Sequence, residues 1–175
     1  MAATFTDLQK AFELHINAEG EIDSGQLVIW FNEAQLDLAL DCGKIVRKVM
    51  IVEPGALYDL PEDCLELVTV EGSDYERTLD GKIVFATGGE ILLYYRQNPQ
   101  PFTGTDSDQV SQLHPALHDL IPIFAAARYW DRESEGDYEE SGLGTKWMNY
   151  YLQGKEQRRQ RLEGIYPKVE RWQVI

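Results

Sequence analysis

Apolar side chains recur three and four positions apart in four stretches of the chain, a spacing that places them on one face of a helix. These stretches lie at about residues 6–18, 24–41, 115–132 and 140–163. In the second stretch Trp30 and Phe31 are the largest apolar side chains, and we expect them to anchor the core. In the fourth stretch the residues expected to point inward are Trp147, Tyr150, Tyr151 and Leu162. The pattern therefore predicts four amphipathic helices.

Capping residues indicate where the first two helices begin. Thr6 and Gln9 have the spacing of a capping box, in which the cap side chain and the residue three positions later bond to each other's backbone N–H. Asp23 or Ser24 is expected to cap the second helix. Gly43 follows the last apolar position of that helix and predicts its end.

The two C-terminal helices contain residues that start or bend a helix. His114 stands before Pro115, a residue suited to the first helical turn, so His114 is predicted to be the cap. Pro122 falls inside the apolar stripe and predicts a kink. In the last helix Gly154 allows a close contact with another helix or a bend.

Between residues 44 and 96 the pattern changes to the alternation and β-branched content of strands. Strands are predicted at residues 44–52, 57–58, 65–71, 75–79, 82–87 and 90–96. Asp80-Gly81 and Gly88-Gly89 are predicted to be hairpin turns, because both pairs tolerate positive φ. The segment is therefore expected to form a meander, as a small antiparallel β-sheet or partial barrel.

The order of these elements predicts an α+β fold. The N-terminal helices and the C-terminal helical pair are expected to form a helical bundle that carries the inserted sheet. A chain of 175 residues suits one domain, expected at 1–164. Residues 165–175 form a C-terminal extension too short for a core of its own, and its aromatic and basic residues predict that it binds a partner.

The formal net charge of −14 argues against a surface that grips nucleic acid. The charge is uneven, since residues 141–175 carry +4 and the first 140 residues carry −18. The basic end is either a solvated helix face or a surface that meets an acidic partner. With no signal peptide pattern, no long apolar run and only Cys42 and Cys64, we expect a soluble intracellular protein without a disulfide framework or membrane partner.

A search for catalytic chemistry finds one candidate group. His114, His118 and Asp119 have a spacing that can place two imidazoles on one helix face, as in metal sites. A third ligand and a general base are missing at any recognisable spacing, so a helix cap and a surface histidine explain the pattern better. We therefore expect no enzyme activity, no cofactor and no bound metal.

The junction from Ile91 to Glu133 resembles a known family. A strand ending in Tyr-Tyr-Arg leads through a proline-containing link into the sequence LHPALHDLIPIFAAARYW and a second helix with paired aromatic residues. The earlier segments LVIWFNEAQLDLAL and YDLPEDCLELVTV fit the same layout. Over about residues 20–163 this order of elements resembles the head–tail adaptor, or connector, proteins of tailed bacteriophages.

The resemblance implies a structural virion protein located in the neck, between capsid and tail, after assembly in the host bacterial cytoplasm. Such adaptors form a homo-oligomeric ring, typically a dodecamer, that binds the portal protein and the next neck or tail-completion protein. DNA passes through the ring without sequence-specific binding, and an acidic body suits such a conduit. The family's portal-docking segment is commonly the C-terminal helix and tail, which here holds Arg158, Arg159, Arg161, Lys168, Arg171 and Trp172.

Two other hypotheses remain open at the level of the sequence. One is a different phage assembly module, such as a tail-completion protein or an assembly chaperone, which would share the architecture without the ring. The other is a small metal-dependent hydrolase that uses His114, His118 and Asp119.

Overall fold

The structure is a computed structural model that describes residues 3–17, 22–104, 106–133 and 141–163. It has an α+β fold, as predicted, and forms two compact units. The helical unit contains the described residues up to Cys42 and those from Pro99 to 163, and the sheet unit contains Gly43–Asn98. The inserted sheet, expected to belong to a single domain, is therefore a compact unit of its own. Its apolar side chains cluster among themselves.

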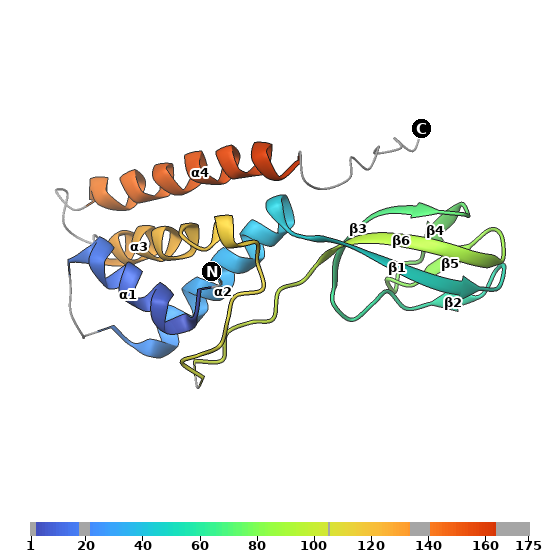
Figure 1. Cartoon of the computed structure of the whole chain (residues 1–175), viewed down its shortest axis with the longest axis horizontal. Coiled ribbons are helices and arrows are strands. Elements are labelled where there is room, and N and C mark those ends of the chain that lie inside the picture. Colours follow the sequence, from blue (N-terminus) through green and yellow to red (C-terminus); the bar gives the residue numbers. More distant parts are fainter. Residues whose placement is uncertain (1–2, 18–21, 105, 134–140, 164–175) are drawn as a thin grey trace. The chain divides into compact units, whose positions relative to one another are not determined.

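Four α-helices and one 3-10 turn make up the helical unit (Figure 1). They are α1 (Phe5–Ile16), α2 (Ser24–Cys42), η1 (Pro115–Leu117), α3 (Leu120–Glu133) and α4 (Ser141–Glu163). Helix α3 contacts each of the other three helices. Among the described residues, no helix combines the length and the apolar character that crossing a membrane requires.

Aromatic rings fill the core of the helical unit. Phe12 and Phe31 are fully buried. Phe5 packs edge-on against both Phe31 and Phe102. The ring centroids are 5.4 Å apart in the Phe5–Phe31 pair and 6.3 Å apart in the Phe31–Phe102 pair. Asn32 holds the loop that carries Phe102, because its side chain accepts from the Phe102 N–H and donates to the Phe102 carbonyl. The long link after the sheet is thus bound to α2.

The first helix begins earlier than predicted. Thr4, not Thr6, is the N-cap, and it forms a capping box with Asp7. Thr6 lies inside the helix, where its hydroxyl donates to the Ser107 carbonyl at 2.9 Å. The helix ends at Ile16, and its C-cap Asn17 adopts the left-handed conformation with φ 55°, so the expected end at residue 18 is also corrected. At the second helix, the Asp23 carboxylate accepts from the Gly25 N–H, as expected of a cap.

The third predicted helix divides into two parts. His114 caps the 3-10 turn η1, and its ring accepts from the Ala116 N–H, as predicted. Helix α3 then starts anew at Leu120. Pro122 is therefore the third residue of a helix and does not break one, because the N–H groups of the first turn have no partner within the helix. The kink expected at Pro122 is replaced by this restart.

The sheet unit consists of two antiparallel three-stranded sheets. Its strands are β1 (Ile45–Val52), β2 (Leu57–Tyr58), β3 (Cys64–Glu71), β4 (Tyr75–Arg77), β5 (Ile83–Phe85) and β6 (Gly89–Gln97). The strand orders are β1-β6-β3 and β2-β5-β4. On β6 the buried residues alternate as Ile91, Leu93 and Tyr95, and they cluster with Ile83 and Phe85 of the other sheet. The core of this unit therefore lies between the two sheets.

The predicted meander is wrong in its pairing. Asp80-Gly81 does join a hairpin, between β4 and β5, with Gly81 at φ 84°. Gly88-Gly89 does not, because β5 and β6 belong to different sheets. A Cβ on Gly88 would lie 2.7 Å from the Pro54 side chain, and Gly89 has φ 125°. These glycines allow a close backbone approach where the chain passes from one sheet to the other.

Gly154 provides the close helix contact that the sequence allows. It is buried, and an added Cβ would lie 2.6 Å from Cδ2 of Leu120, a core residue. Intrinsic helix propensity favours alanine by about 1 kcal/mol, whereas overpacking a core costs about 1–3 kcal/mol. We expect Gly154→Ala to lower the free energy of unfolding by about 1 kcal/mol in urea titrations. The control is Gly142→Ala, which meets nothing within 4 Å, and the prediction is wrong if both variants are stabilised alike.

Candidate interaction surface

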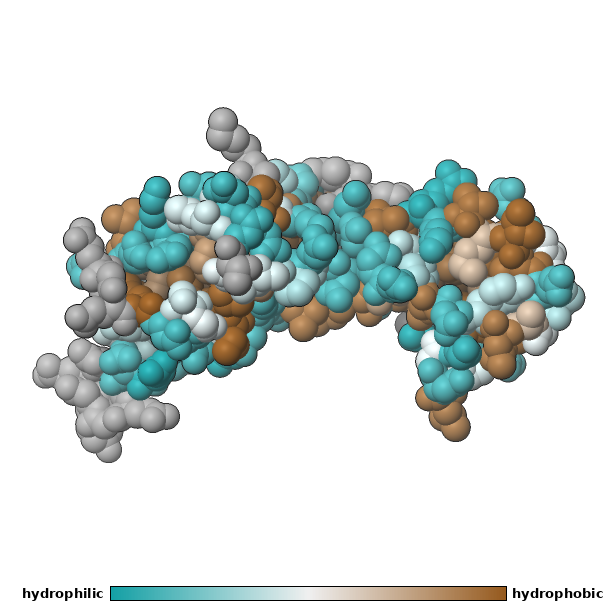
Figure 2. All heavy atoms as spheres, turned by 90° about the horizontal axis from the view of Figure 1, so that it is seen from below, coloured by the Kyte–Doolittle hydropathy of each residue, from teal (hydrophilic) through white to brown (hydrophobic). Residues whose placement is uncertain are grey.

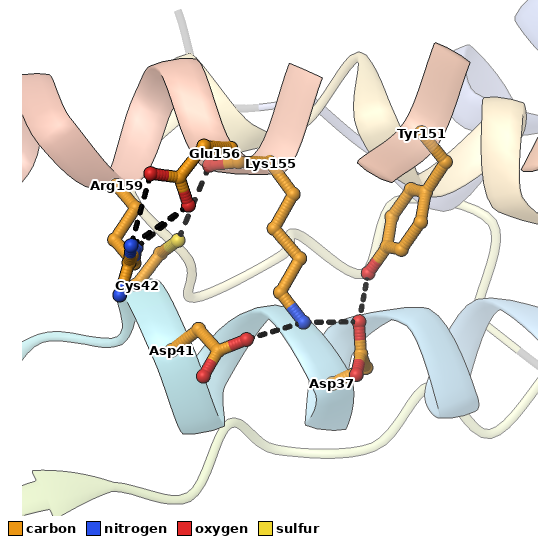
Figure 3. Close-up of polar contacts among 7 residues, drawn as sticks. All are labelled: Asp37, Asp41, Cys42, Tyr151, Lys155, Glu156 and Arg159. Carbon is orange, nitrogen blue, oxygen red and sulfur yellow. Dashed lines mark hydrogen bonds and ion pairs between the residues drawn. The ribbon is translucent and has the colours of Figure 1, made fainter. Parts of the chain in front are cut away.

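A polar network joins α4 to α2 (Figure 3). The Lys155 ammonium lies 2.7 Å from Oδ2 of Asp37 and 2.5 Å from Oδ2 of Asp41. The buried Tyr151 hydroxyl donates to the same Asp37 carboxylate. Both pairs, Asp37 with Asp41 and Tyr151 with Lys155, are four residues apart, so each pair projects from one face of its helix. The network fixes the position of α4 on α2.

The network changes the titration of Lys155 and Tyr151. Burial alone lowers the pKa of Lys155, but the hydrogen bonds to Asp37 and Asp41 outweigh burial and the pKa is raised overall. Burial, together with the hydrogen bond to Asp37, raises the pKa of Tyr151. Lys155 is therefore a cation and Tyr151 a neutral donor throughout the physiological pH range. Both residues serve to hold the helices together.

The predicted portal-docking residues differ in what they contact. Arg158 is used inside the helical unit, because Nε donates to the Ala116 carbonyl at 2.8 Å and Nη2 pairs with Asp119. Arg159 pairs with Glu156 on the same helix. Arg161 is exposed. Lys168, Arg171 and Trp172 lie outside the described residues, as does the whole 165–175 extension.

The proposed metal-binding group does not converge in the structure. His118 is buried, its Nδ1 accepts from the Ala3 N–H at 3.0 Å and its Nε2 lies 2.9 Å from the Leu113 carbonyl. Both ring nitrogens are thus used in hydrogen bonds. His114 acts as a cap, and Asp119 pairs with Arg158. Among the described residues, no group of three His, Cys, Asp or Glu side chains is placed to hold a metal ion.

His118 is expected to make folding pH-dependent. Burial lowers its pKa, although the hydrogen bond to Leu113 acts in the opposite direction. The unfolded chain therefore binds a proton before the folded chain does, so stability is full above about pH 6.5 and falls at lower pH, by at most about 1.4 kcal/mol per pH unit. Burial lowers the pKa of His15 as well, with the same sign.

We expect urea titrations at pH 7.5, 6.5 and 5.5 to show this loss of stability. His118→Gln keeps an acceptor and a donor but does not titrate, and it should flatten the pH dependence. His15→Gln serves as the comparison, because His15 packs against Trp147 with ring centroids 4.8 Å apart and contributes a pH dependence of the same sign. Equal profiles for the parent chain and His118→Gln would contradict the prediction.

Several large apolar side chains remain exposed on the structured elements. On α2 these are Ile29, Leu36 and Leu40, exposed by 51, 43 and 45%. On β1 they are Val49 and Ile51, exposed by 51 and 83%. Figure 2 shows such apolar side chains interspersed with polar ones on the face it displays. The sequence analysis does not single out the exposed residues of α2. A signal for them was present, because α2 is apolar on more than one side, whereas an amphipathic helix of a monomer has one apolar stripe.

Comparison with known proteins gives no family. No protein-family model matches the sequence, and no curated protein matches it. The function is therefore argued from the residues and contacts described above.

Proposed function

We propose that the chain is a structural component of a tailed-bacteriophage neck, which assembles into a ring between the capsid portal and the tail. The observation that carries the proposal is the exposed aliphatic row on α2. Its residues Ile29, Leu36 and Leu40 lie on a helix whose other side forms the core. Exposed apolar side chains gathered on one rigid element mark protein–protein contact surfaces. An assembling protein fits this feature.

The charge and the element order support the same proposal. The order of two N-terminal helices, an inserted segment of antiparallel strands and two C-terminal helices fits the layout of the adaptor proteins that the sequence resembles. A net charge of −14 repels the phosphate backbone. A ring of such chains would extend the DNA channel without gripping the DNA. In this proposal its partners are further copies of itself, the portal and the next neck or tail-completion protein.

Native mass spectrometry and negative-stain electron microscopy test the proposal. The purified chain is measured alone and mixed with the portal protein of the same phage. We expect a ring of high order, alone or once portal is present. A chain that stays monomeric in both samples contradicts the proposal, and one that binds another neck component as a monomer fits a tail-completion protein or chaperone instead.

Truncation after Gly164 tests the docking role of the extension. We expect the truncated chain to lose portal binding by at least about tenfold in affinity, since Trp and Arg side chains dominate interface energies. Trp172→Ala and Arg171→Ala in the full-length chain should each lose part of it. Circular dichroism of the truncated chain provides the control for folding. Undiminished portal binding would show that the docking segment lies elsewhere.

A further inference from the structure

One exposed row of side chains runs along α2. Ile29, Glu33, Leu36 and Leu40 are four, three and four residues apart, which places them on one face over about 17 Å of helix. The three aliphatic members are each at least 43% exposed. Glu33 is half-exposed and lies 3.6 Å from Arg128. Glu33 is the one charged member of this row, because Asp37 and Asp41, the other charged residues of α2, bind Lys155 of α4. We name these four residues the α2 row.

A second exposed row, which carries basic side chains, runs along α4. Its members are Lys146, Tyr150, Gln153, Gln157 and Arg161, spaced by four, three, four and four residues over about 22 Å. All except Tyr150 are polar or basic, and the row contains no acidic side chain. Tyr150 is 49% exposed, and the Lys146 ammonium lies 5.9 Å from its ring centre. We name these residues the α4 row.

The α4 row faces away from α2 of the same chain. Tyr151 and Lys155 point from α4 toward α2, as Figure 3 shows. Successive residues of a helix are rotated by about 100°, so Tyr150, which precedes Tyr151, lies on a side of α4 that faces away from Lys155. Trp147, next to this side, packs against His15 of α1 at 4.8 Å. Among the described residues, the α4 row is therefore placed to contact a neighbouring molecule.

We infer that the α4 row of one copy docks on the α2 row of the next. This inference rests on the proposed ring. We place a second copy there because a single helical unit carries both an apolar row with one carboxylate, Glu33, and a row with one aromatic and two basic side chains. Two different surfaces in contact make a heterologous interface, which produces a closed ring when the rotation between copies closes. Tyr and Arg are enriched in such contacts, and opposite charges set their register.

Complementation between two broken surfaces tests the inference. Leu36→Asp with Leu40→Asp breaks the α2 row, and Tyr150→Asp with Arg161→Glu breaks the α4 row. All four side chains are exposed, so both double variants are expected to fold, which circular dichroism checks. Each alone should raise the concentration for half-assembly at least about tenfold. Mixed together they retain one intact pair of rows and should form a 1:1 dimer that grows no further.

Native mass spectrometry with and without portal reads the outcome. Leu14→Asp, at a side chain 79% exposed on α1, is the control and should assemble as the parent chain does. Rings from either double variant, or no dimer in the mixture, overturn the inference but leave the ring itself standing. A parent chain that forms no ring under either condition overturns the proposed function, and the interface with it.

Discussion

Replacing Phe12 with alanine is expected to destabilise the helical unit by about 3–5 kcal/mol, the usual cost of removing a buried phenylalanine. Phe12 is fully buried on α1. Its ring lies between those of Trp30, Phe31 and Tyr129, at 6.3, 6.5 and 6.1 Å. Because these partners are held by α2 and α3, they cannot all move in to fill the cavity. Such a loss is a large share of the 5–15 kcal/mol that stabilises a typical domain.

Urea denaturation followed by circular dichroism gives the loss of stability, with Leu14→Ala on the same helix as the matched control. Leu14 is 79% exposed, so its variant should change stability by at most about 0.5 kcal/mol. Hydrogen exchange locates the effect. Protection should fall in α1–α4 and persist in β6, whose buried residues contact the core of the sheet unit. Equal loss in both units would show that they unfold as one.

The sequence predicts elements well where one local pattern decides them. Residues 90–96 are rich in aliphatic and aromatic side chains and follow a glycine turn, which predicts a strand, and in β6 every second residue, Ile91, Leu93 and Tyr95, is buried. His114 before Pro115 similarly has few alternatives to a cap. The prediction of Thr6 as the N-cap of the first helix is wrong, because Thr4 and Asp7 form an equally good capping box three residues apart. The loop contact between Thr6 and Ser107, distant in sequence, favours the earlier start.

Pairing between elements could not be predicted in the same way. Strand periodicity shows which residues face a core, but it does not identify the neighbouring strand. Gly88-Gly89 suits a hairpin and a passage between sheets equally well, and in the structure it joins β5 and β6 of different sheets, where Gly88 lies close to Pro54. Tyr150 and Tyr151 pose a similar problem on α4. Both were expected inside, yet Tyr151 is buried at 1% exposure and Tyr150 is 49% exposed.

The network between α2 and α4 was also hidden in the sequence. Asp37, Asp41 and Lys155 are common charged residues on helices, where solvent exposure is the usual explanation. Their meeting depends on the angle at which α4 lies on α2. Helix α4 is also held by contacts with other elements, since Gly154 lies close to Leu120 of α3 and Arg158 donates to the Ala116 carbonyl of η1. A periodic pattern on one helix contains no information about such contacts.

Lys155→Met is expected to lower the free energy of unfolding by about 2 kcal/mol. Methionine keeps most of the aliphatic stem, so the change chiefly removes the charge. The side chain of Lys155 is 13% exposed, whereas those of Asp37 and Asp41 are 42 and 50% exposed. Breaking a fully buried pair costs about 3–5 kcal/mol and an exposed pair about 0–1 kcal/mol, so this half-buried network falls between them. Without the ammonium, two carboxylates repel each other beside the buried Tyr151.

Urea titrations compare Lys155→Met with a triple variant that also carries Asp37→Asn and Asp41→Asn. The comparison separates the lost attraction from the remaining repulsion. The triple variant should recover part of the loss, because it removes the unpaired negative charges. Lys10→Met, at an exposed position on α1, is the control for removing one positive charge and should change stability by at most about 0.5 kcal/mol. If Lys155→Met and Lys10→Met unfold at the same urea concentration, the contacts of Lys155 do not hold α4 on α2. Since the α4 row is presented by that helix, a real loss of stability should also weaken ring assembly, although Lys155 itself lies outside both rows.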